Sequence, residues 1–150
     1  MQYAIDLADK GVDLNAGGPF GAIVVKDGKI IGQGYNCVTS KNDPTAHAEV
    51  LAIREACKNL NSFQLDGCTI YTSCEPCPMC IGAIYWARPK QVFYACSRND
   101  ASEIDFDDQF IYDELHKDMS KRTIKFKGIM REEALKVFNK WGKKADKIKY

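Results

Sequence analysis

The feature that most constrains this chain is a cysteine cluster at residues 74–80, C-E-P-C-P-M-C, preceded by a His-Ala-Glu tripeptide that begins at His47. If Pro78 begins a helix, the thiols of Cys77 and Cys80 share one face of its first turn. The positive end of the helix dipole stabilises their thiolate forms. Two thiolates and one imidazole are the three protein ligands of a catalytic zinc site, whose fourth position holds water. The sequence therefore predicts such a site.

Glu49 follows His47 by two residues and is predicted to act as the proton carrier beside the zinc-bound water. Residues two apart on a regular helix point to nearly opposite sides, so these two can share a site only at the mouth of a helix. The Asp-Pro-Thr sequence at 43–45 is a helix-start signal of that kind. We therefore expect the helix that carries both residues to begin next to the metal.

Two other metal sites use similar cysteine patterns. A closed structural zinc site would recruit Cys74 as a fourth ligand, and Glu49 would then have no role. An iron–sulfur cluster would need one more cysteine in register, and position 84 is Ile. The catalytic arrangement accounts for the histidine and the glutamate together and is favoured. A zinc-stabilised binding module is the alternative without catalysis.

Composition is that of an ordinary globular protein. The chain has 150 residues, of which 45% are hydrophobic and 27% charged, with a formal net charge of +1. This length predicts one domain over 1–150. No apolar run approaches membrane-spanning length, and the near-neutral charge produces no overall attraction to nucleic acid or to an anionic membrane. Without a secretory signal, we expect a cytoplasmic protein with reduced cysteines at 37, 57, 68 and 96.

Hydrophobic periodicity and turn signals outline the order of elements. Helices are predicted over 1–15, 46–59, 77–87 and 131–150. Strands are predicted over 21–26, 29–35, 68–73 and 91–95, with a further short strand at 124–127. Strands and helices alternate through the middle of the chain, which predicts an α/β fold of three layers, α/β/α. Its mixed central sheet would have about five strands covered by helices.

Further motifs accompany the metal motif. They are G-G-P-F-G-A at 17–22, N-D-P-T-A-H-A-E at 42–49, Y-T-S-C-E-P-C-P-M-C at 71–80, G-A-I-Y-W-A-R-P-K at 82–90, F-D-D at 106–108 and Y at 150. The pair H-x-E and P-C-x-x-C is by itself the signature of zinc-dependent deaminases of bases and nucleosides. With the other motifs, the chain resembles the bacterial guanine deaminases of the cytidine-deaminase-like superfamily. The resemblance covers nearly the whole chain and is weakest over 113–145.

The resemblance implies zinc-dependent hydrolysis of guanine, a small purine base, to xanthine and ammonia, with one Zn²⁺ ion per subunit. Glu49 and Asp108 are the implied catalytic residues, and Asp108 would meet the amino-bearing edge of the purine. A carboxylate suits the N–H donors of guanine, an amide can meet its acceptors, and aromatic rings suit stacking on the base. The implied substrate-binding residues are Asn36, Phe20, Trp86, Phe106 and Tyr150.

The resemblance also implies a homodimer. In that family the C-terminal segment, here about 131–150, crosses to the other subunit, so Tyr150 would complete the partner's site. A chain-terminal tyrosine would otherwise be frayed, and this role therefore rests on the resemblance alone.

Other deaminases share part of this pattern. A tRNA adenosine deaminase has the same D-P-T-A-H-A-E motif, and the seven Lys or Arg residues at 131–150 could contact a polyanion. The stretch at 99–118, which contains eight acidic residues, argues against that partner because it carries Asp108, the residue expected to contact the substrate. A guanosine or cytidine deaminase differs only in whether its pocket admits ribose. A nucleic-acid substrate is therefore not expected, and these enzymes are the alternatives to a guanine deaminase.

Overall fold

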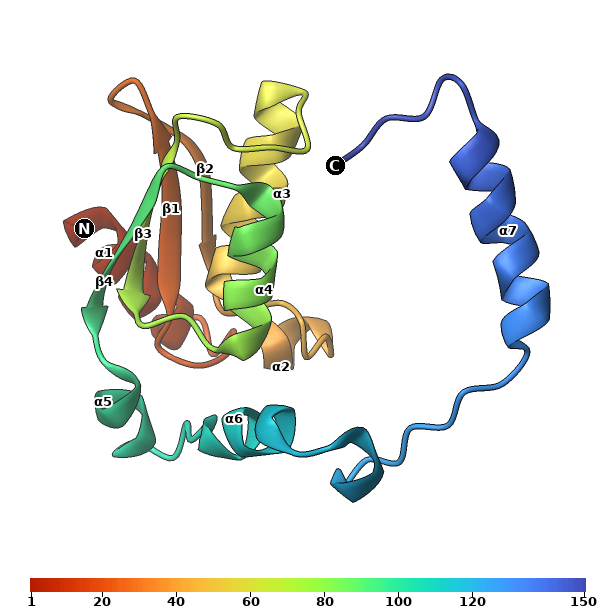
Figure 1. Ribbon diagram of the computed structural model, residues 1–150. Helices are drawn as coiled ribbons and strands as arrows, with labels where there is room; N and C mark the ends of the chain where they lie inside the picture. Colours follow the sequence, from red (N-terminus) through yellow and green to blue (C-terminus); the bar gives the residue numbers. More distant parts are fainter. The chain divides into compact units, whose positions relative to one another are not determined.

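A mixed sheet of four strands lies at the centre of residues 1–108 (Figure 1). The computed structural model describes residues 1–150, and their contacts divide them into two units, Met1–Asp108 and Gln109–Tyr150. β1 is antiparallel to β2 and to β3, whereas β3 and β4 are parallel. In the order β2-β1-β3-β4, the strands are Lys29–Tyr35, Gly21–Lys26, Thr69–Cys74 and Gln91–Cys96.

The sheet has four strands, so the expectation of a fifth strand is wrong. The segment at 124–127 is irregular backbone. Ile124 and Phe126 alternate with lysines as strand residues would, but a strand needs a neighbouring strand to take up its backbone hydrogen bonds. Residues 109–150 contain no strand that could serve as this neighbour.

The β1–β2 hairpin follows from the Asp-Gly pair at its turn. Asp27 and Gly28 both adopt positive φ, 49° and 75°, as the common two-residue hairpin turn requires. Lys26 therefore pairs directly with Lys29, and the two strands have the bounds expected from the sequence.

Helices cover both faces of this sheet (Figure 1). On one face, Leu7 packs against Ile23. The larger core is on the other face and includes Leu65 and Ile70, which are fully buried. Burying side chains of this size contributes about 1.5–3 kcal/mol each. The three-layer α/β/α arrangement is thereby confirmed. The helices of this unit are α1 (Gln2–Asp13), α2 (Val38–Lys41), α3 (Ala48–Leu60), α4 (Pro78–Ala87) and α5 (Arg98–Ser102).

The second unit consists of short helices and connecting segments. Acidic side chains in the first turn of α7 and lysines in its last turn complement the helix dipole. The helix predicted over 131–150 ends at Lys143, and a turn follows at 145–146. One domain with an exchanged C-terminal segment stays a prediction. The helices are α6 (Gln109–His116), a 3₁₀ helix (Met119–Lys121) and α7 (Arg131–Lys143).

None of the helices in either unit combines the length and the apolar character needed to cross a membrane.

Candidate active site

Two helix starts bring the three predicted metal ligands together. His47 is the N-cap residue of α3, and Cys77 is the N-cap residue of α4. Pro78 begins α4, as its restricted φ predicts, and the first turn then places Cys80 beside Cys77. One ligating atom from each of the three residues lies within 4.8 Å of the other two.

The spacing of these atoms fits a tetrahedral zinc ion. His47 Nδ1 lies 3.6 Å from Cys77 Sγ and 3.5 Å from Cys80 Sγ. Zinc–nitrogen bonds of about 2.05 Å and zinc–sulfur bonds of about 2.3 Å, meeting at the tetrahedral angle, separate nitrogen and sulfur by about 3.6 Å. The donor set, one imidazole and two thiols, leaves one coordination position for water. The residues present therefore fit a catalytic zinc ion.

Cys74 does not join this cluster. It ends β3, and its thiol donates a hydrogen bond to the carbonyl oxygen of Ser97 at 3.5 Å. Burial, followed by the nearby Cys96, raises the pKa of the Cys74 thiol to about 11. Because the metal-ligating group contains three residues without Cys74, the structure does not form the closed four-ligand site.

The two cysteine ligands differ in their electrostatic environment. Hydrogen bonds from Cys80 and His47 lower the pKa of Cys77 to about 4 despite its partial burial. The same contact with Cys77, followed by burial, raises the pKa of Cys80, and the Cys77 contact also raises the pKa of His47. The three side chains share protons through these contacts, and a cation that replaces the protons would be held by all three.

Glu49 lies beside these ligands in the first turn of α3. Its side chain is buried, and Oε2 accepts a hydrogen bond from Cys80 Sγ at 3.4 Å. Oε1 accepts a hydrogen bond from the hydroxyl of Thr72 at 3.3 Å. Burial raises the pKa of the Glu49 carboxyl. A raised pKa suits a carboxyl group that must both accept and donate a proton during a reaction. The expected helix start next to the metal ligands is confirmed, because α3 begins at Ala48.

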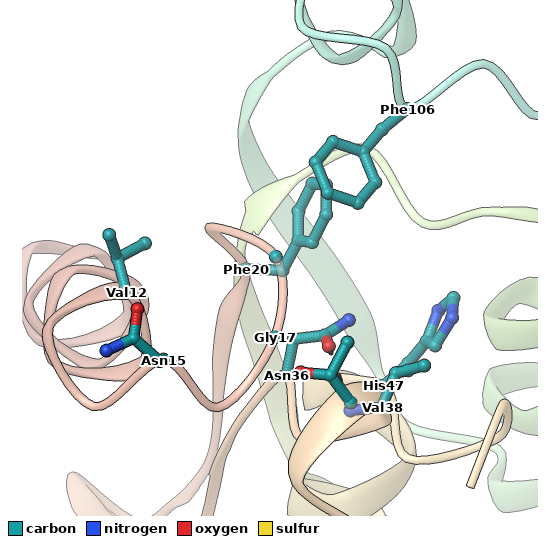
Figure 2. A pocket seen from close by; sticks show the side chains of 10 residues that line it. Val12, Asn15, Gly17, Phe20, Asn36, Val38, His47 and Phe106 are labelled. Carbon is teal, nitrogen blue, oxygen red and sulfur yellow. Dashed lines mark hydrogen bonds between the residues drawn. The ribbon is translucent and has the colours of Figure 1, made fainter. Parts of the chain in front are cut away.

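A pocket of about 550 Å³ opens onto His47. Figure 2 shows the rings of Phe20 and Phe106 together on one side of this pocket, with Asn36 and His47 on the other. The two rings meet edge to face, with centroids 5.0 Å apart. Such a cleft, with aromatic walls and a few polar groups, is typical of a site for a small planar ligand. The other lining residues are Val12, Asn15, Gly17, Gly18, Val38 and Thr39.

The amide of Asn36 is held in one orientation. Its side chain is 3% exposed, and Oδ1 accepts a hydrogen bond from the backbone N–H of Val38 at 3.1 Å. The NH₂ group is therefore the part that can donate to a ligand. Gly17 makes this possible, because a Cβ at that position would overlap Oδ1 of Asn36.

Three other predicted site residues have different placements. Asp108 is half-buried, and the pKa of its carboxyl is raised first by burial and then by the charge of Cys77, so it lies within electrostatic reach of the metal ligands. Trp86 is 63% exposed on α4, and neither Trp86 nor Asp108 is among the residues that line the pocket. Tyr150 ends the second unit. The functional roles of these three residues stay predictions.

Part of the site was not predicted from the sequence. Val38 and Thr39 line the pocket from α2, a single helical turn between the strand predicted over 29–35 and the helix predicted over 46–59. The contact between Thr72 and Glu49 was not predicted either. A threonine between apolar neighbours on the buried face of a strand is the one signal that could have indicated this contact.

Comparison with known proteins agrees with the geometry. Residues 1–96 match the cytidine and deoxycytidylate deaminase zinc-binding region. Guanine deaminase of Bacillus subtilis is 57% identical over 150 residues, which is 100% of this chain and 96% of the relative. The X-ray structure of guanine deaminase from that organism superposes with a TM-score of 0.96 at 58% identity, covering 99% of this chain and 95% of the other.

A second class of relatives is more distant. The tRNA-specific adenosine deaminase of Buchnera aphidicola is 42% identical over 125 residues, covering 83% of this chain and 80% of the relative. The similarity to the B. subtilis protein is higher and extends over the full chain. The chain belongs to the bacterial guanine deaminase family, within the cytidine-deaminase-like zinc-dependent deaminases.

Proposed function

We propose that this protein hydrolyses guanine to xanthine and ammonia, using one zinc ion per subunit. The observation that carries the proposal is the position of Glu49, buried with Oε2 3.4 Å from the sulfur of the ligand Cys80. A closed structural zinc site would have no use for a buried carboxylate there. Ammonia release from guanine by the zinc-loaded protein tests the proposal.

The chemistry requires a nucleophile and two proton transfers. His47, Cys77 and Cys80 would hold the zinc ion, which would supply the nucleophile by lowering the pKa of water to about 7. Glu49 would move the two protons of the attacking water in turn, one to the ring nitrogen beside the amino-bearing carbon and one to the leaving amino group. The products would then be xanthine and ammonia, with Glu49 returned to its starting state.

Recognition of guanine is proposed to use one carboxylate and one amide. Asp108 would accept from the N–H donors on the amino-bearing edge of guanine, and the NH₂ group of Asn36 would donate to an acceptor. Adenine lacks this donor edge. Stacking on Phe20 and Phe106, whose rings form one wall of the pocket, would hold the plane of the base.

Substitution of Gly17 should weaken guanine binding without removing the metal. In Gly17→Ala the new methyl group overlaps Oδ1 of Asn36 and displaces its amide. Loss of one oriented hydrogen bond predicts a rise in KM of about tenfold, with zinc retained. Gly82→Ala is the matched control, since a Cβ there meets open space on α4. An unchanged KM in Gly17→Ala, measured beside that control, would contradict the role of Asn36.

We also propose that the protein is a homodimer that works in the cytoplasm, where reducing conditions keep its thiolate ligands available. The second unit supports a partner, because its helices have no buried residues and α7 exposes three large apolar side chains. They are Val137, Phe138 and Trp141. Exchange of the C-terminal segment would cover such a surface and bring Tyr150 to the partner's site.

Complementation tests the exchange. Deletion of residues 145–150 should abolish activity if this segment completes a site. Mixing the deletion variant with Glu49→Gln should restore part of the activity, because one mixed site then has both an intact Glu49 and an intact tail. The measurement is ammonia release after subunit exchange has been verified by mass. No recovery in verified mixed dimers would exclude a tail that acts on the partner.

A further inference from the structure

The buried face of β3 contains one side chain that its strand pattern does not explain. Alternate side chains of a strand lie on the same face, so one face of β3 carries Ile70, Thr72 and Cys74. Ile70 belongs to the apolar core beneath α3 and α4. Thr72 is fully buried, and its neighbour on β1 is the fully buried Ala22. Valine would fill the same space without bringing a hydroxyl into the core. The hydroxyl therefore needs a specific partner.

That partner is the carboxylate of Glu49. Thr72 Oγ1 donates to Oε1 at 3.3 Å, while Oε2 lies 3.4 Å from Cys80 Sγ. The two oxygens of Glu49 thus have separate surroundings, one on the sheet and one at the metal ligands. A flexible glutamate with three rotatable side-chain bonds is held at both ends of its carboxylate.

We propose that Thr72 is a positioning residue that aims Glu49 for proton transfer, an inference that rests on the proposed function of Glu49. Glu49 follows the ligand His47 by only two residues, so the helix alone does not direct its side chain toward the metal. The hydroxyl on β3 supplies the missing constraint. With Oε1 engaged by Thr72, Oε2 is the oxygen on the side of the metal ligands. Thr72 is neither one of the residues that line the pocket nor one of the three candidate metal ligands.

Two substitutions separate the hydroxyl from packing. Thr72→Val keeps the branched shape and removes the donor, whereas Thr72→Ser keeps the donor and removes a methyl group. By analogy with partners that orient metal ligands, loss of the hydroxyl should lower kcat about 10- to 100-fold. KM for guanine should stay within about twofold, because substrate contacts are unchanged. Thr72→Ser should retain kcat within about threefold of the parent, a difference that a packing role does not predict.

The measurements are kcat and KM for guanine, zinc content by elemental analysis, and the unfolding temperature. A Thr72→Val variant with zinc bound and parental kcat would overturn the inference. So would equal losses in the valine and serine variants, which would indicate packing. If the valine variant does not fold, Thr72→Ala replaces it, since alanine and serine differ from each other mainly by the hydroxyl. Equal kcat in that second pair would likewise overturn the inference.

A double substitution distinguishes this inference from the function on which it rests. With Glu49→Gln in place, addition of Thr72→Val should cause no further loss of the residual rate, because its target is gone. A further loss would show that Thr72 acts independently of Glu49 and would overturn the inference alone. Full activity in the single Glu49→Gln variant would instead overturn the proposed proton transfer.

Discussion

Replacing Glu49 by glutamine should leave zinc bound and remove nearly all turnover. Glutamine has the same shape and can occupy the buried space beside Thr72 and Cys80, but it cannot carry a proton between water and the purine. Positioned acid–base groups contribute roughly 10²- to 10⁴-fold to a rate, and one carboxylate here serves two transfers, so we expect a loss toward the upper end of that range.

The control for this variant lies on the same helix. Glu55 is exposed on α3, and its carboxylate accepts a hydrogen bond from the backbone N–H of Gln33 at 2.7 Å. Glu55→Gln makes the same chemical change outside the site and should leave kcat near the parental value. Both variants should contain zinc in equal amounts. Parental turnover by zinc-loaded Glu49→Gln would exclude this residue as the proton carrier.

Removal of Cys77 should abolish both zinc binding and turnover. Hydrogen bonds from Cys80 and His47 lower the pKa of the Cys77 thiol to about 4, which favours the thiolate form that binds zinc. In Cys77→Ala one imidazole and one thiol remain, too few to hold a catalytic zinc ion. Without the metal, water near pH 7 is too weak a nucleophile, and the rate should fall at least about 10³-fold.

Elemental analysis after dialysis checks this prediction. Cys96→Ala is the control, because Cys96 is an exposed cysteine on β4 outside the ligand group. It should keep zinc and activity. A strong chelator should reduce the activity of the parent protein, and added zinc should restore it. Stoichiometric zinc in Cys77→Ala would contradict the assigned ligand set.

Local signals in the sequence were sufficient for much of this fold. The Asp27-Gly28 pair between the two predicted strands is a hairpin signal, because both residues adopt the positive φ that the turn requires. Pro78 predicted the start of α4, and the spacing of the two cysteines then predicted two ligands on its first turn. These features depend on neighbours in the sequence, so they could be inferred without the structure.

Features that depend on tertiary contacts could not be inferred in this way. A period-two pattern at 124–127 suggested a strand, but no neighbouring strand is present to form it. The contact of Thr72 with Glu49 joins residues 23 positions apart, on a strand and a helix. Similarly, a Cβ at Gly17 would overlap the side chain of Asn36. Gly17 precedes β1, whereas Asn36 follows β2. Such contacts are set by how the layers pack together.

Ammonia release from the zinc-loaded protein tests the proposed activity when six substrates are offered in parallel: guanine, guanosine, adenine, cytosine, cytidine and a tRNA. We expect turnover of guanine and none of comparable rate on the others, since the pocket is proposed to bind a free purine base with a donor edge. Release from tRNA or a nucleoside, with none from guanine, would contradict this proposal.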